Sequence, residues 1–313
     1  MNNLGKQGKP FTFLFDFEMK NLVILESPKN FGNLWFQIPM FSYSPVSNQI
    51  NTLKIWKIQP VSFENYKAGF DLVKRHILNG NTYLLNYTQP TQIETNLSLE
   101  EIFYISSAPY KIYLKDKFVC FSPEPFIKIQ DGEIYSYPMK GTIDAGIENA
   151  EQLILTDSKE IAEHNTIVDL IRNDLSLVAE NVVVEKFRYL SHIQTNQKNL
   201  WQVSSKISGD LPKNFAENLG DILFALLPAG SISGAPKKKT LEIIEKTENY
   251  ERGYYTGIFG IFDGNNLDSC VLIRYIENQN GQLIYKSGGG ITFMSEAGKE
   301  YDELLEKVYV PII

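Results

Sequence analysis

Two pairs of glutamates in this sequence could bind a metal ion. Glu160 and Glu163 are three residues apart in one predicted helix, and Glu300 and Glu303 are three residues apart in another. Residues at positions i and i+3 project from the same helix face, so each pair presents two carboxylates together. Such oxygens suit a hard cation such as Mg²⁺, which retains waters that a substrate can replace. Glutamates with this spacing are also common on solvated helix surfaces, where Asp157 would simply cap the first helix.

Two further residues lie where predicted strands end. Lys140, in PMKGT, follows the strand run EIYSYPM, and Glu124 lies at a strand–turn junction in FSPEPF. Burial would lower the pKa of a lysine and expose its free amine, which is then a nucleophile. A lysine in this position, beside Gly141, could also clamp an anion or simply face solvent.

Two glycine-rich segments could bring the main chain close to a ligand. GSISGAPKKK (230–239) is not a P-loop, because its second glycine is followed by Ala-Pro and not by Lys-Ser or Lys-Thr. We expect Pro236 to be the first residue of a helix capped by Ser233 or Gly234, with free N–H groups that could bind an anion. A plain strand-to-helix turn is the alternative. The run Gly288–Gly290 requires the main chain to pass close to a ligand or to a neighbouring element.

The elements that position these residues are predicted as hairpin strands mixed with separate helices. The clearest helix begins at Ser62, repeats apolar residues every three or four positions and ends at Gly80. Strand runs such as FTFLFDF, NLVILE and NLWFQI do not alternate singly with helices, which favours α+β architecture with antiparallel sheets. We expect a single domain over residues 1–313, with a short N-terminal strand region over about 1–58. Further helices are expected from near Asp157, over 215–227, after the 230–239 segment and over 298–308.

The composition is that of an ordinary globular protein with an acidic balance. The chain has 313 residues, with 30 Lys and Arg against 37 Asp and Glu, which gives a formal net charge of −7. Its 19 Phe, 17 Tyr and 3 Trp supply enough apolar surface to exclude a disordered chain. The negative charge argues against nucleic-acid binding. An anionic ligand must therefore be held by a few locally placed cations.

Neither cysteines nor apolar segments indicate a secreted or membrane protein. The two cysteines, Cys120 and Cys270, lie in strand-like runs and are predicted to be buried thiols rather than a disulfide or zinc ligands. The N-terminus lacks the features of a signal peptide. The longest apolar stretches, such as ILFALL (222–227), are too short to span a bilayer. We expect a cytoplasmic protein with no membrane partner.

The motifs together, in this order, resemble the chorismate-utilising enzymes. This family includes anthranilate, isochorismate, salicylate and aminodeoxychorismate synthases. The resemblance implies an α+β fold in which two large antiparallel β-sheets pack as a sandwich with flanking helices and the active site between them. The matching blocks run from about residue 60 to the C-terminus and are FSPEPF, PMKGT, SKEIAEHNTIVDLIRND, PAGSISGAPK, RGYYTGIFG, VLIRY and GGGI…KEYDELLEK.

Matched position by position, the resemblance implies roles for individual residues. Glu163 and Glu303 correspond to the principal Mg²⁺ ligands of the family. Glu160 and Glu300 correspond to partners that act on the metal largely through water. The positions that correspond to chorismate contacts are Gly141, Thr142, Tyr255, Arg274, Gly288, Gly289, Gly290 and Lys307.

Lys140 indicates which member of the family this chain resembles. A lysine at this position is similar to the aminodeoxychorismate synthase type, component I, whereas anthranilate and isochorismate types usually carry alanine. The family mechanism implies that the lysine amine attacks C2 of chorismate and that ammonia then attacks C4. Glu124 corresponds to the general acid that protonates the departing C4 hydroxyl. Gln202 stands where anthranilate synthases carry a histidine, which counts against that activity.

The source of nitrogen is expected to be outside this chain. Both cysteines lie among apolar strand residues, and neither resembles a glutaminase nucleophile. The resemblance therefore implies free ammonia or a separate glutamine amidotransferase subunit, component II, in the biosynthesis of 4-aminobenzoate and folate. The alternatives are an anthranilate or isochorismate/salicylate synthase, a non-catalytic homologue, and an unrelated α+β binding protein.

Overall fold

Two antiparallel sheets of nine strands each form the framework of the protein. The computed structural model describes residues 1–313 except 27–31, 47–50, 194–198 and 313. Sheet A carries the strand of Lys140 at one end of its order. Its strands, in spatial order, are β11 (Met139–Asp144), β13 (Leu200–Asp210), β10 (Glu133–Ser136), β9 (Pro125–Gln130), β16 (Leu267–Val271), β15 (Ile258–Phe262), β1 (Phe11–Phe15) and β2 (Leu22–Glu26), with β12 (Glu180–Ile193) also on β13.

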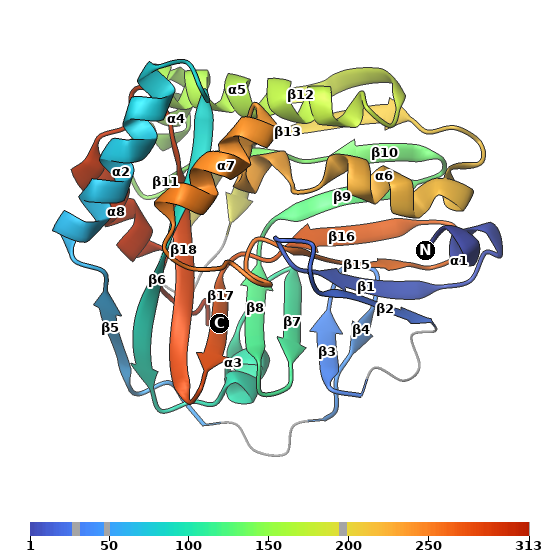
Figure 1. The fold of residues 1–313 in the computed structure, drawn as a ribbon, viewed down its shortest axis with the longest axis horizontal. Helices are drawn as coiled ribbons and strands as arrows, with labels where there is room; N and C mark the ends of the chain where they lie inside the picture. Colours follow the sequence, from blue (N-terminus) through green and yellow to red (C-terminus); the bar gives the residue numbers. More distant parts are fainter. Residues whose placement is uncertain (27–31, 47–50, 194–198, 313) are drawn as a thin grey trace.

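Sheet B carries the run of three glycines in its long strand β18. In Figure 1 its strands stand upright, whereas those of sheet A run across the view. The spatial order is β14 (Gly234–Ala235), β6 (Leu84–Thr95), β18 (Gln282–Ile291), β17 (Tyr275–Gln279), β8 (Phe118–Ser122), β7 (Tyr110–Leu114), β3 (Leu34–Gln37) and β4 (Ser42–Tyr43), with β5 (Trp56–Pro60) also on β6.

The two sheets pack on each other through a shared apolar core. Leu14 and Phe259 of sheet A and Phe36 and Ile112 of sheet B belong to one buried cluster. Strand β1 is buried at all five positions, because its alternate side chains face this cluster and a second one beneath the helices. The predicted α+β sandwich is therefore confirmed.

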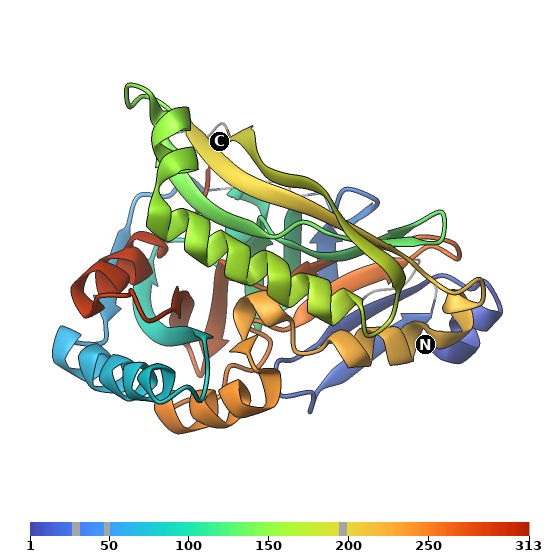
Figure 2. The same cartoon turned by 90° about the horizontal axis from the view of Figure 1, so that it is seen from above.

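Helices cover the outer faces of the sandwich. In Figure 2 the long helix α5 lies along sheet A, and α2 and α8 lie side by side next to sheet B. Among the described residues, no helix is long and apolar enough to cross a membrane. The helices are α1 (Asn2–Lys6), α2 (Phe63–Leu78), α3 (Leu99–Ile105), α4 (Ala150–Thr156), α5 (Ser158–Leu175), α6 (Leu219–Leu226), α7 (Lys237–Thr247) and α8 (Ala297–Glu306), with two short 3₁₀ turns, η1 (Phe215–Asn218) and η2 (Gly230–Ile232).

Several sequence predictions of these elements hold. The Ser62 hydroxyl accepts a hydrogen bond from the Asn65 N–H at the start of α2, as a helix cap should. Asp157 caps α5 in the same way. Cys120 and Cys270 are free, buried thiols, as expected.

Four local predictions are wrong. The expected strand EIYSYPM ends at Ser136, and Lys140 lies inside the next strand, β11, rather than after a strand. Pro236 is the cap of α7 and not its first helical residue. Gly234 does not cap that helix, because it pairs with Leu85 as part of β14. The expected helix over 215–227 is divided into η1 and α6.

Candidate active site

The first glutamate pair lies at the start of α5, against β11. The Asp157 carboxylate accepts a 2.9 Å hydrogen bond from the Glu160 N–H and fixes the first turn. Glu160 then packs on Gly141, where a Cβ would lie 2.6 Å from the Glu160 Oε2. Because Gly141 also has a φ of +92°, a side chain there would be strained as well as crowded. The glycine after Lys140 thus lets the helix approach the strand.

The second pair lies at the start of α8, facing the glycines of β18. A Cβ on Gly289 would lie 3.5 Å from the Glu300 Oε2 and 3.8 Å from both the Glu303 Oε1 and the Lys307 Nζ. Lys307 pairs with Glu303 at 2.6 Å and donates a 2.8 Å hydrogen bond to the Gly288 carbonyl. The Glu303–Lys307 pair therefore lies beside the glycines of β18, with the Glu303 side chain 39% exposed.

Gly288 and Gly290 are required by neighbouring elements more than by a ligand. A Cβ on Gly288 would lie 2.7 Å from the Tyr87 carbonyl oxygen of β6, and one on Gly290 would lie 3.1 Å from the Leu84 side chain. Only the middle glycine faces the carboxylates. The run of three glycines thus combines close strand packing with one position that is open to the site.

Two lysines join the glutamate pairs. The Lys140 Nζ lies 2.7 Å from the Glu163 Oε2. The Lys159 Nζ lies 3.7 Å from the Glu163 Oε1 and 3.6 Å from the Glu300 Oε1, so it bridges α5 and α8. The Glu163 and Glu300 side chains are 5% and 4% exposed. The alternative of a solvated helix surface is therefore wrong for Glu163 and Glu300.

The charges around Lys140 raise its pKa, whereas the sequence led us to expect a lowered one. Burial alone lowers its pKa, but the nearby Glu163, Glu303 and Glu160 more than offset this and leave the pKa above its ordinary value. Without other cations, Lys140 is thus an ammonium group. For Glu303, burial raises the pKa, whereas Lys307 and Lys140 lower it more strongly, to about 2.

The chemistry of the carboxylates fits a hard cation. The Glu160 Oε2 is buried without a hydrogen bond among the described residues, and the Glu163 oxygens have only the ammonium groups of Lys140 and Lys159 as partners. Carboxylate oxygens are the ligands that Mg²⁺ prefers. In this structure the carboxylates are spaced for ion pairs with Lys140 and Lys159, not for a shared metal ion. Within the described part of the chain, no group of three or more acidic, histidine or cysteine side chains is close enough to hold a metal ion.

Glu124 lies in the turn between β8 and β9, on the other side of the site. Its Oε1 accepts a 2.6 Å hydrogen bond from the Ser231 hydroxyl. Burial raises the pKa of Glu124, opposed by the hydrogen bond from Ser231 and by the positive charges of Arg274 and Lys307. Such a carboxyl group is suited to general acid catalysis.

The remaining predicted residues come from other parts of the two sheets and from the loop before β15. Tyr255 is buried, and the Arg274 guanidinium lies 5.6 Å from the centre of the Tyr309 ring. Thr142 of β11 is exposed and pairs across the sheet with Gln202 of β13. Gln202 therefore lies beside the segment that carries Lys140.

Sequence reasoning missed two residues of this site. Lys159 lies four residues before Glu163, so the i,i+4 spacing on α5 could have indicated the ion pair. Ser231 lies inside PAGSISGAPK, but nothing in the sequence indicates its contact with Glu124, which comes from a distant strand.

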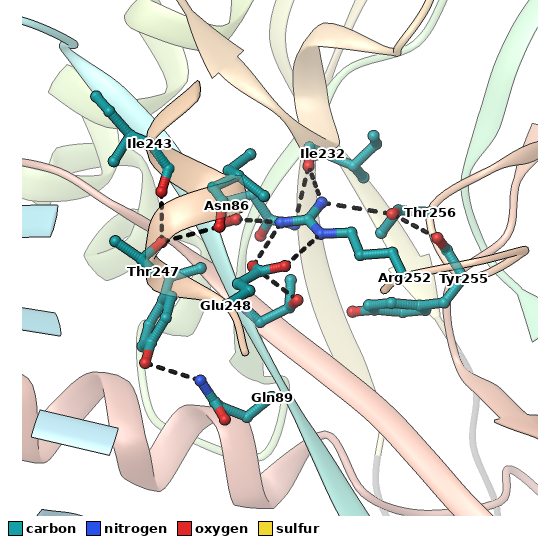
Figure 3. Close-up of polar contacts among 12 residues, drawn as sticks. Asn86, Gln89, Ile232, Ile243, Thr247, Glu248, Arg252, Tyr255 and Thr256 are labelled. Atoms are coloured by element: carbon teal, nitrogen blue, oxygen red, sulfur yellow. Dashed lines mark hydrogen bonds and ion pairs between the residues drawn. The ribbon is translucent and has the colours of Figure 1, made fainter. Parts of the chain in front are cut away.

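A buried ion pair supports the loop that carries Ser231. Figure 3 shows Arg252 between Glu248 and the end of η2. The guanidinium donates hydrogen bonds of 2.8 and 2.7 Å to the two Glu248 oxygens, 2.8 Å to the Ile232 carbonyl and 2.7 Å to the Asn86 carbonyl. The Arg252 and Glu248 side chains are each 1% exposed. One side chain thus links α7, η2 and β6.

Comparison of structures defines the class of fold. The menaquinone-specific isochorismate synthase MenF of Escherichia coli matches with a TM-score of 0.73 and 16% identity, over 95% of this chain and 77% of that one. The anthranilate synthase component I of Streptococcus pneumoniae matches with a TM-score of 0.70 and 24% identity, over 83% and 60%. The two-sheet architecture is therefore that of chorismate-utilising enzymes.

Comparison of sequences identifies the family. The chorismate binding enzyme family matches residues 42–312, so this chain belongs to that family. The uncharacterized PabA-like protein of Haemophilus influenzae is 52% identical over 99% of this chain and 95% of its own length.

Two named synthases are more distant relatives. Anthranilate synthase component 1 of Acetivibrio thermocellus is 33% identical over 79% of this chain and 52% of its own length. Aminodeoxychorismate synthase component 1 of Bacillus subtilis is 30% identical over 80% and 55%. This chain therefore spans about half of each of these two proteins.

Removing the bridging lysine should destabilise the metal-free protein. In the variant Lys159→Met, Glu163 and Glu300 lose a shared cation. Because Lys159 is 35% exposed, solvent screening limits the expected loss to about 1–2 kcal/mol in urea unfolding at low salt. Lys239→Met, which removes an exposed lysine paired with Glu242, is the matched control and should change stability by less than about 0.5 kcal/mol. Equal effects of the two variants would contradict the bridge.

Proposed function

We propose that this chain converts chorismate and ammonia to 4-amino-4-deoxychorismate, with Lys140 as the nucleophile. The observation that carries the proposal is the place of Lys140, 2.7 Å from Glu163 among the carboxylates and not on the surface. The similarity to an aminodeoxychorismate synthase component supports the same reaction. We further propose the roles of chorismate contacts for Gly141, Thr142, Tyr255, Arg274, Gly288, Gly289, Gly290 and Lys307.

Mg²⁺ is proposed as the cofactor. Glu163 and Glu303 would hold it directly, and Glu160 and Glu300 through water. When bound, Mg²⁺ would neutralise a carboxylate of chorismate and the excess negative charge of the site. Lys307 and Arg274 supply the local cations that a dianionic substrate needs in a chain with a net charge of −7.

The first step forms a bond between Lys140 and the substrate. The ammonium group of Lys140, which lies 2.7 Å from the Glu163 Oε2, first gives up a proton to water, because Glu163 is the proposed Mg²⁺ ligand. The free amine then attacks C2, both ring double bonds shift by one position (C1=C2 to C1=C6 and C5=C6 to C4=C5), and the C4–O bond breaks. Glu124 donates its proton to the departing hydroxyl, which leaves as water.

The second step transfers nitrogen to C4. Ammonia attacks C4, both ring double bonds shift back, and the C2–N bond to Lys140 breaks. The freed lysine amine then takes up a proton again and returns to its ammonium form. The Glu124 carboxylate accepts the proton that the incoming nitrogen loses, so the acid of the first step is restored. The net reaction consumes chorismate and ammonia and yields 4-amino-4-deoxychorismate and water.

Ammonia is proposed to come from free solution or from a separate glutamine amidotransferase subunit. The two cysteines, Cys120 and Cys270, are fully buried, and burial raises the pKa of both thiols, so neither is suited to glutamine hydrolysis. The product would serve 4-aminobenzoate and folate biosynthesis in the cytoplasm.

Anthranilate synthesis is the second candidate. The similarity to an anthranilate synthase component is slightly higher, at 33% identity. In that reaction an external nucleophile attacks C2 and Lys140 forms no bond. Gln202, which lies beside Thr142, is not an acid or base and so offers no proton transfer for the loss of pyruvate.

Product analysis tests the proposal. The protein is incubated with chorismate, Mg²⁺ and ammonium, and the products are separated and identified by mass. We expect 4-amino-4-deoxychorismate, at least about 100-fold less of it after EDTA, and recovery when Mg²⁺ is restored. Anthranilate, isochorismate or salicylate as the main product would contradict the proposed reaction.

A further inference from the structure

The segment PAGSISGAPKKK has no role in the reaction described so far. Its Ser231 hydroxyl donates a 2.6 Å hydrogen bond to the Glu124 Oε1. Among the described residues, the Glu124 carboxyl group accepts this hydrogen bond through Oε1. The second oxygen of Glu124, Oε2, is then left for the substrate. The main chain of Glu124 is fixed separately, since its N–H donates to the Ser122 hydroxyl and its carbonyl accepts from the Val271 N–H.

We propose that Ser231 is a positioning residue that fixes the carboxyl group of Glu124 and favours its charged form. This inference rests on the proposed function, in which Glu124 is the general acid. A carboxyl group buried without a donor holds its proton too tightly to give it to a leaving group. A hydroxyl that donates to the carboxylate makes Glu124 a stronger acid. It also fixes the orientation of the carboxyl group, so that Oε2 faces the substrate.

The loop around Ser231 is held firmly enough to place one hydroxyl. The carbonyl of the next residue, Ile232, accepts hydrogen bonds from Arg252 at 2.8 Å and from Asn86 at 3.1 Å (Figure 3). On the other side, a Cβ on Gly230 would lie 2.8 Å from the Asp174 Oδ2. The position of Ser231 is thus fixed by the contacts of its two neighbours in the chain, Gly230 and Ile232.

Other charged groups near Glu124 do not replace Ser231. The hydrogen bond from Ser231 lowers the pKa of Glu124 more than the charge of Arg274 or the charge of Lys307 does singly. A cavity of about 20 Å³ is lined by Glu124, Ser231 and Ser136, among other residues. The titratable and charged groups that face Glu124 or line this cavity are Arg274, Lys307, Tyr137, Asp174 and Cys270.

The cavity supplies matched variants for the test. Ser231→Ala removes the hydroxyl, and Ser231→Thr keeps it and adds a methyl group to a residue that lines the cavity. Ser136→Ala removes a hydroxyl from another residue that lines the same cavity, where it donates to the Phe126 carbonyl and not to Glu124. Each variant is first checked for an unchanged unfolding transition.

The experiment measures the pKa of Glu124 directly, by ¹³C NMR titration of carboxyl-labelled glutamate, with Glu124→Gln to assign the signal. In Ser231→Ala we expect that pKa to rise by about 1 and the alkaline limb of the kcat/KM profile to move by the same amount. Ser231→Thr should restore the wild-type value, and Ser136→Ala should leave it unchanged. An unchanged pKa in Ser231→Ala, or an equal rise in Ser136→Ala, would overturn the proposal.

The titration separates this inference from the proposed function. The pKa of Glu124 in the substrate-free protein does not depend on which product the enzyme forms. If the product is not aminated at C4, the proposed function fails while the NMR result still decides the effect of Ser231. If amination occurs but the pKa does not move, only the inference about Ser231 fails.

Discussion

Replacing Lys140 by alanine should lower the formation of 4-amino-4-deoxychorismate by about 10³-fold or more. The variant lacks the only group that the proposed mechanism bonds to C2, and loss of a covalent nucleophile has effects of this order. An external nucleophile could then reach C2, so traces of a C2-substituted product are expected. The measurement is the rate and identity of products from chorismate and ammonium.

Two control variants separate the charge of Lys140 from its nucleophilicity. Lys140→Arg keeps a cation beside Glu163 but cannot provide a free amine, so it should fold normally and remain inactive. Lys206→Ala removes a lysine of sheet A that pairs with Glu185 and should retain activity. Full formation of the aminated product by Lys140→Ala would exclude the lysine mechanism.

Replacing Arg252 by leucine should cause the largest loss of stability. It leaves Glu248 charged and buried and removes donors to the Ile232 and Asn86 carbonyls. Breaking a buried ion pair from one side costs about 3–5 kcal/mol, which for a chain of this length corresponds to a melting temperature lower by roughly 5–8 °C. Urea unfolding of the variant measures the loss.

The buried pair also predicts a difference between single and double variants. The double variant Arg252→Leu/Glu248→Leu should be more stable than Arg252→Leu, because no unpaired charge remains inside. Arg172→Leu, which removes an exposed arginine from its pair with Asp169, should change stability by less than about 1 kcal/mol. A loss of that small size in Arg252→Leu would contradict the importance of the pair.

Much of the fold follows from local sequence patterns. Ser62 and Asp157 begin helices where their side chains can cap, and grouped strand runs predict antiparallel sheets. The errors arise where pairing with a distant strand overrides local preference. Gly234 looks like a helix cap, but its hydrogen bonds with β6 draw it into sheet B.

The site could be predicted only in part. The i,i+3 spacing of Glu160 and Glu163 occurs both in metal sites and on solvated helix surfaces. Only the packing of these residues against β11 and α8 distinguishes the two kinds of site. The pKa of Lys140 has the opposite direction from the expected one, because Glu303 and other carboxylates come from elements that are distant in sequence. Such long-range charge cannot be read from the segment around Lys140.

The most direct test of the central claim is the mass of the protein during the reaction without ammonia. The enzyme is mixed with chorismate and Mg²⁺, quenched, and measured intact and after proteolysis. We predict an added mass equal to chorismate less one water, located on the peptide that contains Lys140 and lost when ammonium is supplied. An unmodified Lys140 in a protein that still forms the aminated product would contradict the account.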